Sequence, residues 1–400
     1  MAQPRAPVRR PRDRKQQIVT AAARQFRQSG YHNVGMSDIA DAVGITGAAL
    51  YRHFGGKQEL LLAAVRDAID QLAQVCHRDV RDLDELLSAM GVLTVGRPDA
   101  GVLWERELRH LPPEVQHDLR GDLRAAVAPL RAAIGNSRPA PAEQDVDLLL
   151  WAVLAVFAST GYHSVGLESG RVRVRLVEAA SALCRSVQIP GRPQPPDGVR
   201  PGPGRSGDVG RGRLLPASRR EAILTAAMRL FGERGYQAVG MDEIGAAAGI
   251  TGASLYHHFP GKSAILATAL NRCLEAMMFD VSGAFDAAAD PAQALQLILS
   301  ACVRSSLEHG EAIGALLGEL NSLADDDRRA IRVMQHDYLT EWSALLMRLR
   351  PELSEPEARV LVHATFTVVH ALLRIPRLRS RPALDGELVA LGEAVLGLGT

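Results

Sequence analysis

Residues 20–64 read TAAARQFRQSGYHNVGMSDIADAVGITGAALYRHFGGKQELLLAA, and residues 225–269 read TAAMRLFGERGYQAVGMDEIGAAAGITGASLYHHFPGKSAILATA. The two stretches align without insertion or deletion at a constant offset of 205 residues, and 25 of the 45 aligned positions are identical. Solenoid repeats recur every 20 to 50 residues or so, whereas this period is the length of a whole domain. The chain therefore carries two copies of one module in tandem.

The composition indicates a helical protein with two cores. The chain has 400 residues, of which 47% are hydrophobic and only 4% aromatic, and it is rich in Ala, Leu, Val and Arg. Such a length can bury two cores, and these residue types favour helices over strands. We therefore expect an all-α fold.

Several classes of protein are disfavoured by what the sequence lacks. The N-terminus does not resemble a signal peptide, and the longest apolar run, residues 148–158, is too short to span a bilayer. The four cysteines form no CxxC pair, which indicates buried thiols in a reducing compartment. We expect a cytoplasmic protein with no membrane span, no metal and no cofactor.

Positive charge gathers around the two copies, although the net charge of the chain is only +1. Residues 1–60 hold ten Lys or Arg against four Asp or Glu, and residues 190–262 hold ten against six. This distribution predicts two surfaces that bind a polyanion. Lys57 and Lys262, two of the only three lysines, occupy the same position of the repeat. Their recurrence indicates a site for a compact ammonium group, and common descent of the two copies also explains it.

Apolar spacing and glycine or proline breaks predict the helices. In the two repeated blocks we expect helices at 12–29, 35–43, 47–54 and 57–79, and at 219–233, 242–248 and 252–259. Gly35 or Ser37 is expected to cap the second helix, and Thr46 and Thr251 are expected to cap the third helix of their copies. Further helices are expected at 104–111, 114–134, 143–163, 172–187, 292–308, 313–323, 325–350, 357–373 and 386–396.

These elements divide the chain into five segments. A Pro-, Gly- and Arg-rich stretch without hydrophobic period predicts a flexible linker at 190–216. We expect a first DNA-binding domain at 12–60 and a first helical regulatory domain at 61–189. After the linker at 190–216, we expect a second DNA-binding domain at 217–265 and a second helical regulatory domain at 266–400.

Two short helices joined by a glycine turn, the second capped by threonine, form the helix-turn-helix pattern. In that motif the second helix enters the DNA major groove while flanking groups hold phosphates. The candidate DNA-binding residues of the first copy are Thr46, Gly47, Ala48, Ala49, Tyr51, Arg52, His53 and Lys57. Those of the second copy are Thr251, Gly252, Ala253, Ser254, Tyr256, His257, His258 and Lys262.

The candidate residues differ in the contacts that they can make. The small residues allow the backbone to approach base edges, and the Tyr, His and Lys positions suit phosphates. Base reading must rely on the threonines, the alanine methyls and Arg52 or His257, which differ between the copies. The alternative is that the apolar positions are simply core, and for Leu50, Phe54, Leu255 and Phe259 we expect that role.

The segments GITGAALYRHFGGK (residues 44–57) and GITGASLYHHFPGK (residues 249–262) resemble the N-terminal domain of TetR/AcrR-family transcriptional repressors, whose hallmark is a turn followed by x-LYxHF-xxK. The resemblance implies two modules, each a three-helix DNA-binding domain followed by a helical ligand-binding and dimerisation domain. It also implies a small-molecule effector and double-stranded DNA as partners. Gly35 and Gly240 depart from the family, which often has a Ser or Thr cap there.

The covalent joining of two modules leaves two possible assemblies. The halves pair within one chain as a pseudo-dimer, through helices 143–163 and 357–373 and the helices after them. Alternatively, each half pairs with its counterpart in a second chain, which presents four DNA-binding heads.

The sequence therefore predicts a ligand-responsive transcriptional regulator, a repressor that binds a pseudo-palindromic operator with two heads. No GxSxG, P-loop, HExxH or Cys/His metal spacing occurs, so we expect no enzyme activity. An architectural DNA-binding protein without ligand control is the alternative.

Overall fold

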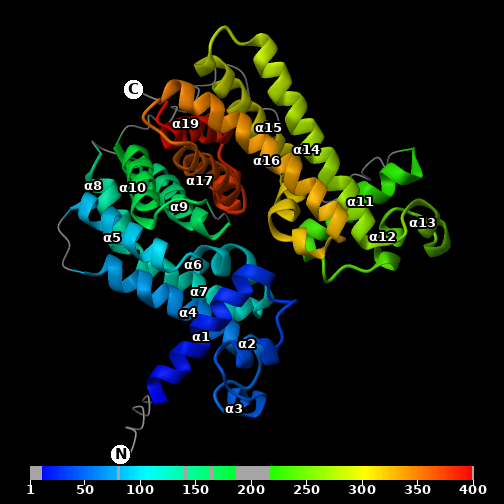
Figure 1. Cartoon of the computed structure of the whole chain (residues 1–400), viewed down its shortest axis with the longest axis horizontal. Coiled ribbons are helices and arrows are strands. Elements are labelled where there is room, and N and C mark those ends of the chain that lie inside the picture. The colour runs from blue at the N-terminus through cyan, green and yellow to red at the C-terminus, as the bar shows by residue number, and fades with distance from the viewer. Residues whose placement is uncertain (1–10, 79–81, 139–141, 163–164, 186–216, 399–400) are drawn as a thin grey trace, which may run out of the picture. The chain divides into compact units, whose positions relative to one another are not determined.

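The computed structural model describes residues 11–78, 82–138, 142–162, 165–185 and 217–398. These residues form helices and no strands, so the protein is all-α as expected (Figure 1). The chain divides into two compact units. The first consists of residues 1–139 and 157–163, and the second of residues 140–156 and 164–400. The expected linker at 190–216 lies outside the described residues.

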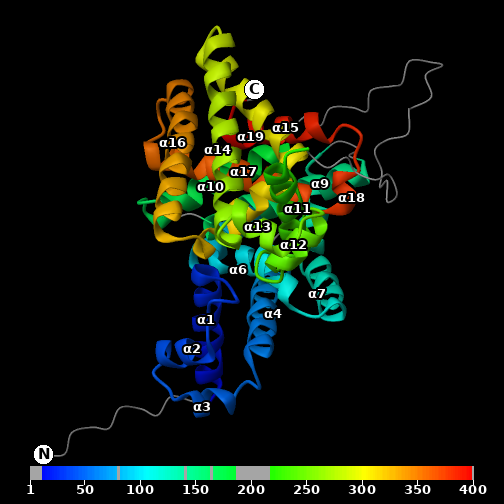
Figure 2. The same ribbon diagram turned by 90° about the vertical axis from the view of Figure 1, so that its right-hand side faces the viewer.

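The first unit begins with the first copy of the repeated block. Its helices are α1 (Pro11–Ser29), α2 (Met36–Ala42), α3 (Gly47–Tyr51) and α4 (Lys57–Cys76). We call α1, α2 and α3 with their connections the first head. Helix α1 packs against α2 and α4, while α3 lies at the outer end of the head (Figure 2). Its outer position leaves one side of α3 open to a partner.

The second unit contains the second head, formed by α11 (Arg219–Arg234), α12 (Met241–Ala247) and α13 (Gly252–His258), and followed by α14 (Lys262–Ala287). Both heads make the same turn between their second and third helices. Gly44 and Gly249 have φ angles of 66° and 67°, a left-handed conformation that favours glycine. The N–H of Ile45 and of Ile250 then donates back into the preceding helix, at 3.0 and 2.9 Å. The sequence repeat is therefore also a repeat of backbone geometry.

Behind the first head, the first unit continues with shorter helices. They are α5 (Leu83–Gly96), α6 (Asp99–Val102), a π-helical turn (Leu103–Glu107), a 3₁₀ turn (Leu108–His110), α7 (Pro113–Ala126) and α8 (Ala128–Asn136). Helix α5 was not predicted, and the single helix expected at 114–134 is two helices in the structure. Pro129 explains the break, because it has no N–H to donate to Ala125. A ring nitrogen of His77 lies 3.1 Å from that carbonyl oxygen instead.

The second unit contains the remaining helices. They are α9 (Glu143–Ala158), whose last two residues belong to the first unit, α10 (Ser169–Arg185), α15 (Pro291–Gly318), a 3₁₀ turn (Leu320–Ser322), α16 (Asp325–Leu349), α17 (Glu355–Leu373), α18 (Pro376–Arg379) and α19 (Leu384–Leu396). The two helices expected at 292–308 and 313–323 are joined in α15, with a kink at His309.

The two repeats meet inside the second unit, where α10 packs against α17 and α19. Near the start of α10, Arg171 and Arg175 reach the buried carboxylate of Glu357 near the start of α17, at 2.8 and 3.1 Å. In the reverse sense, Arg381 before α19 pairs with Asp145 near the start of α9, at 2.6 Å. One set of ion pairs thus runs from arginines of the first repeat to the second, and the other from an arginine of the second repeat to the first. We call this contact the seam.

Helix α9 accounts for the most apolar stretch of the chain. Residues Glu143–Gly161 are long and apolar enough to cross a membrane by composition, yet 56% of this segment's most apolar window is buried inside the protein. This segment is longer than the apolar run at 148–158, and length and composition alone are weak evidence for a membrane span.

We expect Glu357→Gln to lower the free energy of unfolding at pH 7 by roughly 1–3 kcal/mol, because the carboxylate accepts charge-assisted hydrogen bonds in a buried site. Bonds from Ser354 and the charges of Arg175 and Arg171 lower the pKa of Glu357 from 4.5 to about 2. Because the folded-state pKa lies below the unfolded value, this stabilisation is present above pH 4.5 and is lost as the pH falls towards 2. Urea unfolding across that range measures the loss.

Glu178→Gln is the matched control, because Glu178 pairs with the same Arg175 but is about half exposed (51%). An exposed pair contributes at most about 1 kcal/mol. Equal losses in the two variants would contradict the role given to Glu357.

Candidate nucleic-acid interface

The third helix of each head starts at a threonine. Thr46 is the N-cap of α3, and its Oγ1 accepts the N–H of Ala49 at 3.2 Å. Thr251 is the N-cap of α13 with the same extended backbone, but its side chain makes no capping bond. Helix α3 ends at Tyr51, earlier than the sequence predicts. The threonine positions are thus equivalent, and the helices that they start differ in length.

Leucine and phenylalanine anchor these helices, and tyrosine does not. Leu50, Phe54, Leu255 and Phe259 are at most 2% exposed, as expected for core residues. Tyr51 and Tyr256 are 56% and 54% exposed. An aromatic ring so exposed at the same place in both copies is available to a partner.

The other candidate residues lie around the two tyrosines. Ala48, Arg52 and His257 are exposed, while Gly47, Ala49, His53, Ser254 and His258 are half-buried. For Gly252 and Ala253 the structure describes the backbone alone, in the first turn of α13. The outward side of α3 is therefore built from Ala48, Tyr51 and the adjoining Arg52, and the described exposed residues of α13 are Tyr256 and His257.

Both heads start their second helix at glycine, where the resemblance leads one to expect Ser or Thr. Gly35 and Gly240 are the N-caps of α2 and α12. The backbone N–H of each donates to a carboxylate three residues on, Asp38 at 2.7 Å and Glu243 at 2.8 Å. Since this bond uses the backbone N–H of the cap and not a side chain, glycine at the cap lowers the stability of the helix little.

Lys57 is bound by its own head. Its Nζ donates to the carbonyl oxygens of Tyr31 and Val34 at 2.8 and 3.0 Å, and lies 3.5 Å from that of His32. The ammonium also lies 4.4 Å from the centre of the Tyr31 ring. Burial lowers the pKa of Lys57, and the nearby carboxylate of Asp38 opposes this shift. Lys57 thus ties the start of α4 to the loop between α1 and α2.

Lys262 repeats this arrangement in the second head. Its Nζ donates to the carbonyl oxygens of Tyr236 and Val239 at 2.8 and 2.9 Å, and lies 4.3 Å from the centre of the Tyr236 ring. Burial also lowers the pKa of Lys262. The compact ammonium that the sequence singles out therefore has backbone carbonyls as partners in both copies, and these bonds leave it little capacity to bind a phosphate.

The π-helical turn joins the first head to the helices behind it. Glu107 is 1% exposed and accepts the backbone N–H of Tyr31 at 3.1 Å. The guanidinium of Arg106 pairs with Glu107 and donates to the carbonyl oxygens of Phe26 and Arg27 at 2.7 and 2.9 Å. The last turn of α1 is therefore capped from behind. We call this contact the first junction.

His110 completes the first junction. Its ring stacks on Tyr31 at a centroid distance of 5.0 Å and meets the edge of His32 at 4.5 Å. Burial, together with the positive charge of Arg109 and other nearby cationic groups, lowers the pKa of His110 from 6.5 to about 3. The ring is therefore neutral at physiological pH.

The second head has a different junction. Glu319 is 9% exposed and stands where the first copy has Glu107. Ser322 replaces His110 there, and its Oγ accepts a bond from the amide of Gln237 at 3.0 Å. Where the first junction stacks His110 on Tyr31, the second thus has a hydrogen bond between Gln237 and Ser322.

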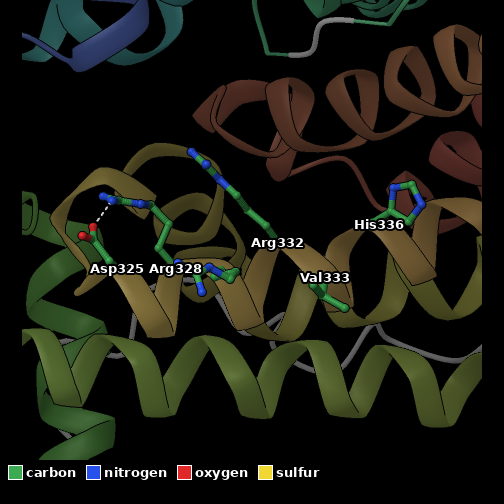
Figure 3. A pocket seen from close by; sticks show the side chains of 6 residues that line it. Asp325, Arg328, Arg332, Val333 and His336 are labelled. Atoms are coloured by element: carbon green, nitrogen blue, oxygen red, sulfur yellow. Dashed lines mark hydrogen bonds and ion pairs between the residues drawn. The ribbon is translucent and has the colours of Figure 1, made fainter.

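Another basic surface lies outside the heads, along α16. Arg328, Arg329, Arg332 and His336 line an open groove with Val333 and Asp325, and the Asp325 carboxylate pairs with Arg328 (Figure 3). Within the described ranges, no three His, Cys, Asp or Glu side chains come together in a way that could hold a metal ion.

Sequence reasoning missed the junction residues Arg106, Glu107 and His110. One signal was present, because Glu107-Leu108 recurs as Glu319-Leu320 in the otherwise diverged part of the repeat. A buried carboxylate that receives a backbone N–H 76 residues away could only be recognised from the folded chain.

Replacing Lys57 with Met should leave three carbonyl groups without their donor and lower the stability of the first head by roughly 1–3 kcal/mol. Faster amide exchange in residues 30–35, measured by mass spectrometry, checks this. DNA affinity should fall for all sequences, with an unchanged salt dependence. A lysine that contacts a phosphate would instead reduce the salt slope by about one and leave stability intact. Arg52→Ala, at an exposed position, is the control and should leave amide exchange unchanged.

Comparison with known proteins identifies the repeated block. The model of the family described as "Bacterial regulatory proteins, tetR family" matches residues 18–64 and 223–269. The chain is 31% identical over 159 residues to the HTH-type transcriptional regulator LmrA of Bacillus subtilis, which is 38% of this chain and 81% of that protein. It is 40% identical over 74 residues to the HTH-type transcriptional activator FasR of Mycolicibacterium smegmatis, which is 18% of this chain and 34% of that protein.

Among solved structures, the ketosteroid transcriptional regulator KstR2 of Mycobacterium tuberculosis is similar, with a TM-score of 0.42 and 24% identity, and the match covers 46% of this chain and 97% of that one. The LmrA match, at 159 residues, is longer than one repeated block and spans 81% of that relative. With its two matches to the family model, this chain belongs to the TetR family of bacterial transcriptional regulators.

Proposed function

We propose that the protein is a cytoplasmic, ligand-responsive transcriptional repressor that binds a pseudo-palindromic operator with both heads. The observation that carries the proposal is the repetition, in one chain, of a third helix that starts at a threonine and has an exposed tyrosine at its outer side. Repression follows if the bound chain covers the promoter.

Within each head, the third helix is the part that enters the major groove. Its first residues (Gly47, Ala48 and Ala49 in α3, and Gly252, Ala253 and Ser254 in α13) allow the backbone to approach base edges. Tyr51, Tyr256, His53 and His258 donate to phosphates, and Thr46 and Thr251 lie where the helix meets the groove. The two lysines act indirectly, by holding the loop before the second helix.

A single chain supplies both heads as an intramolecular pseudo-dimer. The support is the seam, in which α10 packs against α17 and α19 and the ion pairs are reciprocal. A seam formed within one chain uses the surface through which a second chain would otherwise pair. The flexible linker expected at 190–216 allows the second module to reach that position.

Ligand control acts through the junctions. A small molecule bound among the helices behind a head favours one set of packing contacts and so shifts the population of head positions. Two heads that no longer match successive major grooves, about 34 Å apart, lose the operator. Glu107 and Glu319 are the groups placed to carry this shift, since each lies buried between a head and its helices.

Light scattering should give a mass near 43.0 kDa for the free protein and one chain per operator duplex. A mass of twice that value would indicate a homodimer with four heads and contradict the pseudo-dimer. In the same preparation, affinity for the upstream region of its own gene should fall steeply with salt, because phosphate neutralisation supplies much of the binding energy. Absence of binding at low salt would overturn the proposed function.

Glu107→Gln should loosen the first head, because the neutral amide can no longer pair with Arg106. We expect faster exchange of the Tyr31 amide and a several-fold loss of operator affinity without ligand. Glu319→Gln is the matched variant and should act on residues 235–240 alone. If Glu107→Gln changed neither exchange nor affinity, the first junction would not be the route of control.

A further inference from the structure

We propose that the operator is asymmetric, with a guanine required only in the half-site bound by the first head, and that Arg52 is the residue that reads it. The inference rests on the proposed function and adds to it a base and a residue that distinguish the two heads. A dimer of identical chains presents two equal heads, so this distinction is open only to a chain with two copies.

Arg52 directly follows the last residue of α3, and its position directs it away from the protein. Leu50 and Phe54 are buried and four residues apart, which defines the inner side of the helical turn. Arg52 lies on the opposite side, four residues after the exposed Ala48. Its backbone is still right-handed helical, with φ −72° and ψ −21°.

A long side chain on a helix leans back over the preceding turn, towards the N-terminus. The stem of Arg52 is therefore directed over the small side chain of Ala48, towards the first turn of α3. In helix-turn-helix proteins that first turn faces the base edges. A larger residue than alanine at position 48 would block this path.

The guanidinium of Arg52 is also uncommitted. Among the described residues it makes no hydrogen bond or ion pair, whereas Arg14 and Arg27 in the same head donate to the carbonyl oxygens of Val43 and Gly161, at 3.2 and 3.0 Å. All its donors can therefore serve a partner without breaking a contact that holds the head.

The second head differs at this position in chemistry and in shape. His257 replaces Arg52 and is exposed, without a partner among the residues described. His257 lies within α13, which continues to His258. The end of α13 is held by Arg220, which donates to the His258 carbonyl at 3.1 Å and lies 4.3 Å from the centre of the Phe259 ring. The corresponding Lys15 lies 5.1 Å from the centre of the Phe54 ring.

These two side chains read DNA differently. Arginine presents two parallel N–H donors that match O6 and N7 of guanine in the major groove, and such a pair discriminates against other bases by a factor of about ten to a hundred. An imidazole has no such fork and cannot make the bidentate contact. The guanine requirement therefore belongs to one half-site.

The experiment is selection of bound duplexes from a random pool with four proteins: wild type, Arg52→His, His257→Arg and the control Arg66→His. Wild type should select a guanine in one half-site and not at the symmetric position. Arg52→His should lose that preference by a factor of about ten to a hundred, and His257→Arg should gain a guanine in both half-sites. Arg66→His changes the same charge at an exposed position of α4 and should select the wild-type sequence.

The outcomes separate this inference from the proposed function. A symmetric wild-type consensus, or a guanine that persists in Arg52→His, would overturn the inference while leaving DNA binding intact. If none of the four proteins enriched any sequence at low salt, the proposed function would fall with it. Because positions 52 and 257 are exposed, circular dichroism should show the same helix content in every variant.

Discussion

Both heads depend on one interaction, an ammonium group held by backbone carbonyls at the start of a long helix. Lys57 and Lys262 each satisfy carbonyl groups of the loop between the first two helices, and each covers a tyrosine ring of that loop. Buried carbonyls without donors would destabilise the loop, and the loop sets the position of the second helix. The tetrahedral ammonium suits several converging carbonyls, which the planar guanidinium does not. This requirement explains why both positions 57 and 262 are lysine, although nearly all other basic residues of the chain are arginine.

Once the loop is fixed, the regions behind it have been free to differ. The first junction has Glu107, Arg106 and His110 around Tyr31, whereas in the second the amide of Gln237 donates to Ser322. Two separate chains of one sequence would carry identical junctions. Covalent joining of the copies removes that constraint, and the seam keeps α10 packed against α17 and α19.

Local features of the heads were predictable because they depend on short-range rules. The turn at Gly44, the cap at Thr46 and the buried Leu50 and Phe54 follow from glycine geometry, capping chemistry and helical periodicity. Helix boundaries and side-chain partners were not predicted correctly where they depend on contacts between residues far apart in sequence. Helix α5 was missed, and the break before α8 was overlooked although Pro129 signals it. The carbonyl partners of Lys57 were not predicted, because they lie 23 to 26 residues away in sequence.

The sequence by itself determined that the chain is helical, that it holds two copies of one DNA-binding module, and that Leu50, Phe54, Leu255 and Phe259 are core residues. These conclusions follow from the composition, from the periodicity of apolar residues and from a repeat without insertions or deletions, all of which are visible in the sequence. Only the tertiary structure decided that the lysines are bound internally, that Glu107 supports a head, and that Glu357 of one repeat meets Arg171 and Arg175 of the other. Those pairings depend on burial and on the meeting of residues far apart in sequence, which no local pattern encodes.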